Sequence, residues 1–457
     1  MQRCSGKPRQ DWQNIILTDG LVYSPTEKPN GTIMQYWKES AFYSIPLDEV
    51  LLLERAAVEI FDMFIAAGDY IVEHPEIMTK MGIPEYAWRQ VIKTWNDEPA
   101  CQSVYGRYDL RFGGLDHPDP GMRVPKVYEF NADTPTCLLE SAWVQWNWLE
   151  HTGQGTDQWN SMFERLIQAW TRNLGLIEQR LGHRPLVHFA CSNEEESGED
   201  VLNTWYLRDA CEDAGYATKG IFMETIELGD DGRFYDPDGV HIDVIFKLYP
   251  WEYMVNEEYG EPCFRDMETI GRRDESDSYT GGTIWIEPPY KMLWSNKGVL
   301  AVLWQLYAGT EQAKYLIPTW FDGEQPAGLT DYVRKPLLGR EGANVVIYRD
   351  GEATLEVPGD YGDEGFVVQE FVPLPEFPDP DGDSSVHPVL GVWMIDGDPA
   401  GLAVRESSGF VTDNLSFFVP HSIPDNADST YTPQEPVRRY EPPVPAGISR
   451  VTVATFR

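Results

Sequence analysis

The sequence has few cysteines and no long apolar run, and each of these absences excludes a class of protein. The 6 cysteines of the 457-residue chain are scattered with no CxxC pair, so their spacing signals neither a disulfide framework nor a zinc site. No window approaches the roughly 20 apolar residues of a membrane span, and residues 1–14 lack the apolar core of a signal peptide. We therefore expect a soluble, cytoplasmic protein with no membrane partner and with buried or incidental thiols.

Basic residues are scarce as well. The chain has 36 Lys and Arg residues against 74 Asp and Glu residues, which gives a formal net charge of −38 at pH 7. Such a charge repels nucleic acids and attracts cations and basic molecules, so it argues against a nucleic-acid partner. It also makes each lysine informative, because a cation kept among so many acids is a good candidate for binding a phosphate group.

Two common nucleotide-binding motifs are also missing, since the chain has no GxxxxGK[ST] and no GxGxxG after a strand. Its 42% of hydrophobic residues can nevertheless bury a large core, and its length indicates two or three domains. Helical and strand patterns alternate, which predicts an α/β fold with an open α/β layer. The expected helices are 49–73, 84–97, 138–149, 158–180, 199–215 and 299–307, and the expected strands are 105–112, 126–133, 185–190, 242–248, 284–289, 333–336, 345–348, 365–373, 389–395 and 400–404.

Three segments have weaker patterns. Residues 1–44 read as irregular, and the charged stretch 259–282 reads as a mobile excursion that could act as a lid. Residues 425–457 are rich in proline and aspartate, which predicts an extended surface tail with a possible last strand at 451–456.

Polar residues stand where two neighbouring strands would normally bury apolar ones. Arg107 and Asp109 are two residues apart, as are Glu129 and Asn131, so on paired strands all four side chains project from one face. Carboxylate and amide oxygens beside an arginine suit a Mg²⁺ held against a nucleotide, which predicts Asp109, Glu129 and Asn131 as metal ligands. The alternative is an ordinary cross-strand ion pair, which would contribute about 0 to 1 kcal/mol.

Two further stretches suit a nucleotide. Lys335 ends a short strand and is followed by the Gly-containing loop 337–344, a hairpin whose main-chain N–H groups and lysine can fold over phosphates. The strand 365–373 carries Gln369 and Glu370, whose main chain could hydrogen-bond adenine and whose carboxylate could bind ribose. The acidic loop 192–200 could hold an amine, although a solvated loop with a helix cap is the favoured interpretation.

Five ordered motifs carry a resemblance to a known family. RYD with YEFNADTPT, then EPPYKMLWSNKGVLAVLW, KPLLGREGANV, VVQEFVPLP and GLAVRE, resemble the synthetase domain of the glutathionylspermidine synthase family in its short form without the amidase domain. The resemblance spans about Trp37 to Ile423. It implies an ATP-grasp-like fold and an ADP-forming acid–amine ligase that uses ATP and Mg²⁺ to join the glycine carboxylate of glutathione to an amine of spermidine through an acyl phosphate.

The resemblance also implies roles for individual residues. The catalytic residues would be Arg107 and Arg405. The residues matching the metal ligands are again Asp109, Glu129 and Asn131. Those implied or expected to bind the nucleotide are Lys297, Lys335, Gly339, Gly342, Gln369, Glu370, Phe371 and Val372. Those near the substrate would be Thr134 and Thr136, together with Glu195 and Glu196 in the acidic loop 192–200, where the match is centred on residues 194–196.

We divide the chain by function into five parts. These are an N-terminal part (1–104), metal-binding strands with a helix (105–150), a substrate-side α/β subdomain (151–282), a nucleotide-binding part (283–424) and the tail (425–457). The loop from Gly339 to Gly342 is a second lid candidate, because an acyl phosphate must be protected from water. Two other functions stay open: an ATP-grasp ligase for a different peptide or amino-acid carboxylate and amine, and a non-catalytic ATP-binding relative.

Overall fold

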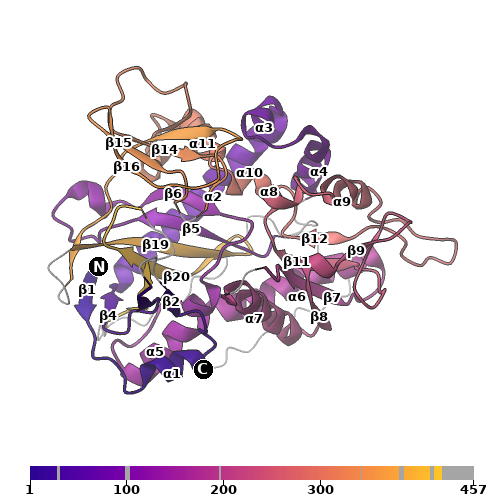
Figure 1. Ribbon diagram of the computed structural model, residues 1–457, viewed down its shortest axis with the longest axis horizontal. Coiled ribbons are helices and arrows are strands. Elements are labelled where there is room, and N and C mark those ends of the chain that lie inside the picture. Colours follow the sequence, from indigo (N-terminus) through magenta and orange to yellow (C-terminus); the bar gives the residue numbers. More distant parts are fainter. Residues whose placement is uncertain are drawn as a thin grey trace.

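The structure is a computed structural model that describes residues 1–27, 31–97, 103–194, 197–340, 342–379, 385–411 and 416–424. It is a mixed α/β protein in which an antiparallel sheet occupies the middle, a second antiparallel sheet lies on one side of it, and a parallel α/β unit lies beside it (Figure 1). Within the described residues, no helix combines the length and apolar character that a membrane crossing requires.

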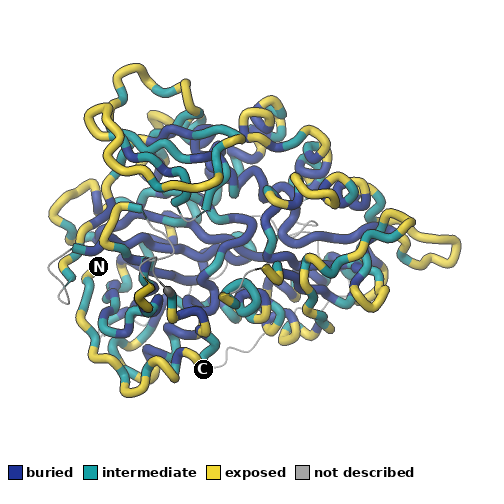
Figure 2. Tube along the Cα trace, in the orientation of Figure 1, coloured by how far each residue is buried: buried dark blue, intermediate teal, exposed yellow. Residues whose placement is uncertain are grey.

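The central sheet carries the polar strands that the sequence singled out. Its order is β21 (Phe417–Phe418), β20 (Asp398–Ser407), β19 (Ser385–Ile395), β5 (Tyr105–Arg111) and β6 (Lys126–Asn131), with β18 (Phe377–Pro378) paired to β19. Strands β19 and β20 are buried along almost their whole length, as the dark blue traces of Figure 2 show. Helix α2 (Leu47–Glu73) packs against this sheet through its apolar side, which includes Leu53, Ile60 and Phe64.

The α/β unit is built on a four-stranded parallel sheet with the order β12 (Ile284–Ile286), β11 (Val244–Leu248), β7 (Val187–Cys191) and β8 (Thr218–Phe222). Strands β7 and β11 are fully buried, as expected for parallel strands covered on both faces. Helices α6 (Met162–Leu181) and α7 (Glu199–Asp213) contribute to the same hydrophobic core.

The second antiparallel sheet forms the upper layer in Figure 1. Its order is β13 (Thr319–Phe321), β17 (Phe366–Glu370), β14 (Tyr332–Pro336), β15 (Val346–Arg349) and β16 (Glu352–Glu356). Helix α11 (Gly298–Tyr307) packs on β13 and β17, and the N–H of its first residue, Gly298, donates a hydrogen bond to the side-chain oxygen of Asn296 at 2.8 Å. The outer strand β16 is exposed along its length.

The remaining elements surround these layers. They are β1 (Gln2–Ser5), α1 (Trp12–Thr18), β2 (Pro25–Glu27), β3 (Ile33–Gln35), β4 (Ala41–Ser44), α3 (Glu76–Lys80), α4 (Glu85–Asn96), η1 (Pro120–Arg123), the π-helical turn η2 (Glu140–Val144), α5 (Gln145–Thr152), η3 (Met223–Thr225), β9 (Glu227–Leu228), β10 (Phe234–Tyr235), α8 (Trp251–Met254), α9 (Gly260–Met267), α10 (Lys291–Ser295), η4 (Glu311–Tyr315) and β22 (His421–Ser422).

Two sequence-based expectations were wrong. Residues 1–44 are not irregular, because β1 and β4 form a three-stranded sheet with the distant β22. Helix α1 lies between β1 and β4 in the sequence. The stretch 259–282 is not a single excursion, since it begins with helix α9, which buries Cys263, Phe264 and Met267 in the core. The predicted strand at 451–456 and the tail that contains it lie outside the described residues.

Candidate active site

The four polar residues of β5 and β6 lie in two directly opposed pairs. The register of the antiparallel strands places Arg107 opposite Asn131 and Asp109 opposite Glu129. The Asp109 carboxylate accepts hydrogen bonds from Arg107 Nε at 2.9 Å and from Asn131 Nδ2 at 3.2 Å. The sequence prediction that these side chains share one face of paired strands is therefore confirmed.

The donor set of this face suits a hard divalent cation. Asp109, Glu129 and Asn131 offer two carboxylates and an amide, whose oxygen and nitrogen can exchange places by rotation. Burial alone would raise the pKa of Glu129, but Lys297, whose Nζ lies 3.2 Å from the carboxylate, and Lys335 outweigh burial and lower this pKa. Glu129 is therefore ionised at neutral pH, as a metal ligand must be. We conclude that the residues present fit Mg²⁺.

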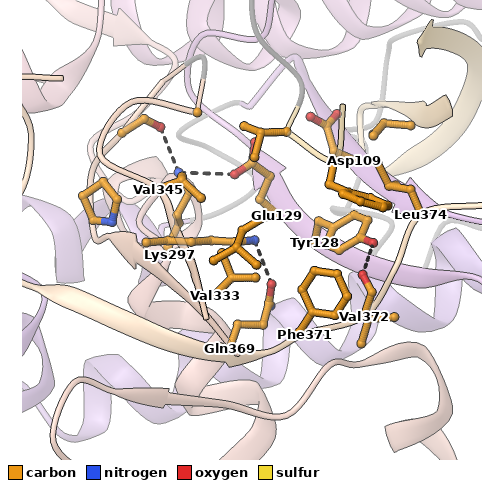
Figure 3. A pocket seen from close by; sticks show the side chains of 18 of the residues that line it. Asp109, Tyr128, Glu129, Lys297, Val333, Val345, Gln369, Phe371, Val372 and Leu374 are labelled. Atoms are coloured by element: carbon orange, nitrogen blue, oxygen red, sulfur yellow. Dashed lines mark hydrogen bonds and ion pairs between the residues drawn. The ribbon is translucent and has the colours of Figure 1, made fainter. Parts of the chain in front are cut away.

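A pocket opens between this face and the upper sheet (Figure 3). All eight residues predicted to bind the nucleotide line it, and so do Asp109 and Glu129. Its other lining residues are Tyr128, Val333, Pro336, Ala343, Val345, Ile347, Leu374, Val389, Phe410 and Val411. The pocket thus combines a largely apolar wall with a cluster of charges at its β5–β6 end, as a base with a polyphosphate requires.

Two lysines bring positive charge to the pocket from different elements. Lys297, next to helix α11, donates from Nζ to the Gly339 carbonyl at 2.8 Å, while Lys335 on β14 donates to Gln369 Oε1 at 2.7 Å. Burial lowers the pKa of Lys335 to about 8, with Glu129 opposing this shift and Lys297 adding to it. The Gly339–Gly342 loop is therefore tied to the lysine that contacts Glu129.

The two predicted catalytic arginines differ in burial, since Arg107 on β5 is buried and Arg405 on β20 is half-buried. Arg107 donates from its terminal nitrogen to the Thr136 carbonyl at 2.6 Å, and burial, which would lower its pKa, is outweighed by Asp109. Arg405 on β20 faces Cys137 and Tyr36, and these groups keep its pKa raised against the effect of burial. Neither arginine lines the nucleotide pocket.

Sequence reasoning missed Tyr128 and Arg340. The Tyr128 hydroxyl donates to the Val372 carbonyl at 2.9 Å, although strict alternation would turn Tyr128 away from its neighbour Glu129. The register of β5 and β6 shifts between Asp109 and Leu110, and this bulge brings the side chains of both Tyr128 and Glu129 to the pocket.

Arg340 belongs to the motif KPLLGREGANV, and its position in the Gly-containing loop was the signal that could have identified it.

Arg340 reaches from that loop to the predicted substrate residues. It donates to the hydroxyl of Thr134 and lies 3.4 Å from the Glu252 carboxylate of α8. The carbonyl of Thr136, the second predicted substrate residue, accepts from Arg107. Glu195 and Glu196 lie outside the described residues. The structure thus gathers the predicted nucleotide residues in the pocket with Asp109 and Glu129. It places Asn131 and Thr136 beside Arg107, and Thr134 beside Arg340.

The comparison with protein families decides the assignment. The family described as "Glutathionylspermidine synthase preATP-grasp" matches residues 3–424. The chain belongs to this family. The match confirms the predicted resemblance, and with it the enzyme class, an ATP-dependent acid–amine ligase.

Sequence relatives differ in length. A Haemophilus influenzae protein that carries the name acid–amine ligase is 33% identical over 440 residues, which are 92% of this chain and 99% of the relative. Trypanothione synthetase of Crithidia fasciculata is 25% identical over 81% of this chain and 54% of its own length. The bifunctional glutathionylspermidine synthetase/amidase of Escherichia coli is 24% identical over 73% of this chain and 52% of its own. The chain thus spans about half the length of the last two relatives.

A solved structure supports the fold. The apo structure of a glutathione synthetase-like effector from Globodera pallida superposes with a TM-score of 0.50 and 12% sequence identity. The superposition covers 90% of this chain and 95% of the effector. At this identity the likeness concerns the fold alone. It agrees with the ATP-grasp-like fold predicted from the five motifs.

Proposed function

We propose that this chain is a Mg²⁺-dependent ligase that forms an amide bond through an acyl phosphate, with glutathione or a similar peptide as the carboxylate and a polyamine as the amine. The observation that supports it best is the opposed pairing of Arg107 with Asn131 and of Asp109 with Glu129, at the end of a pocket that also holds two lysines. This arrangement puts metal ligands, phosphate-binding cations and an arginine beside one another.

The nucleotide would lie with its base against the apolar wall and its phosphates near the lysines. The main chain of Gln369 to Val372 would hydrogen-bond the adenine, and Tyr128 holds the Val372 carbonyl in place. Lys297 and Lys335 would pair with the phosphates as point charges. Bound Mg²⁺ supplies neutralisation of the charge on the phosphate oxygens, and Asp109, Glu129 and Asn131 are the residues that would hold it.

The arginines would act on the reacting carboxylate. A carboxylate is a poor acylating agent, and transfer of the γ-phosphoryl group to it makes it a good one, with charge developing on the phosphoryl oxygens during transfer. Arg107, which is held by Asp109 and the Thr136 carbonyl, would stabilise this charge, and Arg405 would orient the carboxylate. Burial of Arg107 keeps water from screening its guanidinium group.

The choice of substrates rests on the sequence relatives. Those from Crithidia fasciculata and Escherichia coli carry names of enzymes that make glutathionylspermidine or trypanothione. The net charge of −38 also favours a cationic amine over an anionic one, because a field of this sign attracts cations.

A substrate panel tests the proposal. Thiol peptides, amino acids and amines, singly and in pairs, would be assayed for ADP release with Mg²⁺ and with a chelator. We expect ADP release only when a carboxylate, an amine and Mg²⁺ are present together, with the highest rate for a peptide and a polyamine. Fast ATP hydrolysis without a carboxylate would contradict ligase chemistry, and a preference for another pair would replace the proposed substrates.

A further inference from the structure

A second group of carboxylates lies behind Arg107, outside the nucleotide pocket. Cys137 follows Thr136 in the loop after β6, Glu140 begins the π-helical turn η2, and Glu199 is the first residue of α7. One ligand atom from each, the Cys137 sulfur and a carboxylate oxygen of both glutamates, lies within 4.8 Å of the others. Turns of the π type are frequent at functional sites.

Hydrogen bonds hold this group together across the two elements. The Leu138 N–H donates to Asn203 Oδ1 at 2.9 Å, and Asn203 Nδ2 donates to the Glu199 carbonyl at 2.9 Å, so the first turn of α7 is tied to the Cys137 loop. Asn203 is itself buried. The three ligand atoms therefore meet because the backbone is fixed, and a cation bound there would need little rearrangement of the chain.

Among the described residues, the Glu140 carboxylate is buried without an ion pair of its own. Glu140 is 0% exposed, and neither of its carboxylate oxygens has a partner that meets hydrogen-bond distance and angle among the described residues. The hydroxyls of Tyr23 and Tyr36 face the carboxylate. Burial, and then the nearby Glu199, raise the pKa of Glu140 to about 7. A buried carboxylate beside a second one must either take up a proton or share a cation.

The balance of charge indicates a divalent cation. With Cys137 as thiolate and both glutamates ionised, the three ligands carry three negative charges, and Arg405, which faces Cys137, offsets one of them. Arg107 is already paired with Asp109. The excess of negative charge around the buried Glu140 carboxylate favours a divalent cation.

We propose that Cys137, Glu140 and Glu199 form a second metal site, for a borderline-soft divalent ion of the Zn²⁺ type. Zinc binds thiolate and carboxylate ligands together, whereas Mg²⁺ takes oxygen ligands, so the two sites would select different ions. Three protein ligands leave a fourth position for water. The Tyr36 hydroxyl, 3.2 Å from the Cys137 sulfur, would support the thiolate from outside the ligand set.

Such an ion would fix the loop that carries Thr134 and Thr136. The Thr136 carbonyl accepts from Arg107, so the position of this loop sets where that guanidinium points. Zinc binding releases the protons of Cys137 and Glu140, because both ligands bind in their ionised forms. The site would therefore bind Zn²⁺ more tightly as pH rises.

Metal retention by the chelator-treated full chain tests the site without nucleotide. Zn²⁺ would be titrated in excess Mg²⁺, which occupies the oxygen-only sites, and the bound metal would be measured after gel filtration. We expect one retained Zn²⁺ per chain, and with Co²⁺ in its place a thiolate-to-metal absorption band. Glu140→Gln and Cys137→Ser should each weaken Zn²⁺ binding by more than about a hundredfold, because loss of a residue that only supports a ligand costs up to about that much. Cys137→Ser should also lose the thiolate-to-Co²⁺ absorption band.

Cys211→Ala is the matched control, because Cys211 is a buried cysteine of helix α7 outside the group. It should retain Zn²⁺ like the wild type. Added Zn²⁺ should raise the melting temperature of the wild type and of Cys211→Ala but not that of Glu140→Gln. Without metal, Glu140→Gln should melt no earlier than the wild type, because it removes a buried charge of the same sign as Glu199.

Two results would overturn the site: a wild-type chain that retains no Zn²⁺ in excess Mg²⁺, or Glu140→Gln and Cys137→Ser variants that retain it fully. The readout is independent of the proposed ligase activity, which is measured by ADP release. A chain that releases ADP with Mg²⁺ and binds no zinc would therefore refute the second site alone.

Discussion

Two groups of carboxylates, Asp109 with Glu129 and Glu140 with Glu199, are compensated in opposite ways. On the nucleotide side, Asp109 pairs with Arg107 and Glu129 pairs with Lys297. On the other side, Glu140 is buried next to Glu199 with no ion pair of its own among the described residues. This difference agrees with the two proposals, in which the first side receives a phosphate with its metal and the second side takes a cation.

Removal of Arg107 should have the largest effect, because Arg107 pairs with Asp109 and also donates to the Thr136 carbonyl, one residue before Cys137. Arg107→Ala should lower kcat by about a hundredfold, close to 3 kcal/mol, with ATP affinity nearly unchanged, since the interaction is made mainly in the transition state. Steady-state ADP release and calorimetric ATP binding give the two quantities.

The control for Arg107→Ala is Arg334→Ala, which removes an arginine that pairs with Asp322 outside the pocket lining. It should leave kcat unchanged. If Arg107→Ala instead lost ATP affinity and kcat in proportion, or melted so early that no folded enzyme remained, Arg107 would be a structural partner of Asp109.

Lys335→Ala comes next in size and concerns the nucleotide side only. The side chain offers a charge-assisted hydrogen bond of about 1.5–3 kcal/mol, so ATP affinity should fall roughly ten- to a hundredfold with the fold intact. Calorimetry of ATP binding measures it. Lys80→Ala, which breaks an exposed ion pair with Glu324, should bind ATP as the wild type does, and equal affinities in all three proteins would remove Lys335 from the site.

The pH dependence of ATP binding sharpens the same contrast. Only protonated Lys335 pairs with phosphate, and its pKa of about 8 in the free protein means that the charge is present below pH 8 and is lost above it. ATP affinity should therefore decrease from pH 8 to 9, with proton uptake on binding at pH 8.5. Calorimetry in buffers of different ionisation enthalpy measures the uptake, and Lys335→Ala should abolish it; an uptake that persists in this variant would assign it to another group.

Tyr128→Phe should have the smallest effect. It removes a single neutral hydrogen bond to the Val372 carbonyl while it keeps the ring, so ATP affinity should fall by about 1 kcal/mol, roughly fivefold. An unchanged affinity for ATP would mean that the segment from Gln369 to Val372 holds its position without Tyr128.

The nucleotide side was largely predictable from the sequence because its signals are local. Residues two apart on a strand share a face, so Arg107, Asp109, Glu129 and Asn131 could be placed together before their register was known. Lys335 and the following Gly-containing loop form one hairpin, and all of its predicted residues line the pocket.

What could not be predicted depends on contacts between distant parts of the chain. Glu140 and Glu199 meet only because α7 docks on the Cys137 loop, and no spacing motif encodes that approach. Residues 1–44 lacked periodicity because short strands such as β4 find a partner in β22, almost at the other end of the described chain. A bulge in β6 turned Tyr128 against the alternation on which the prediction relied.

The central claim is that the β5–β6 face holds Mg²⁺ for carboxylate-dependent turnover of ATP. A Mg²⁺ titration of ADP release, in the wild type and in Glu129→Gln, tests it most directly. Glu129→Gln removes a ligand charge and keeps the shape, so it should need a higher Mg²⁺ concentration and recover part of its activity there, with the melting temperature of the wild type. A variant that melts early and is not rescued at any Mg²⁺ concentration would contradict the claim and make Glu129 a structural partner of Lys297.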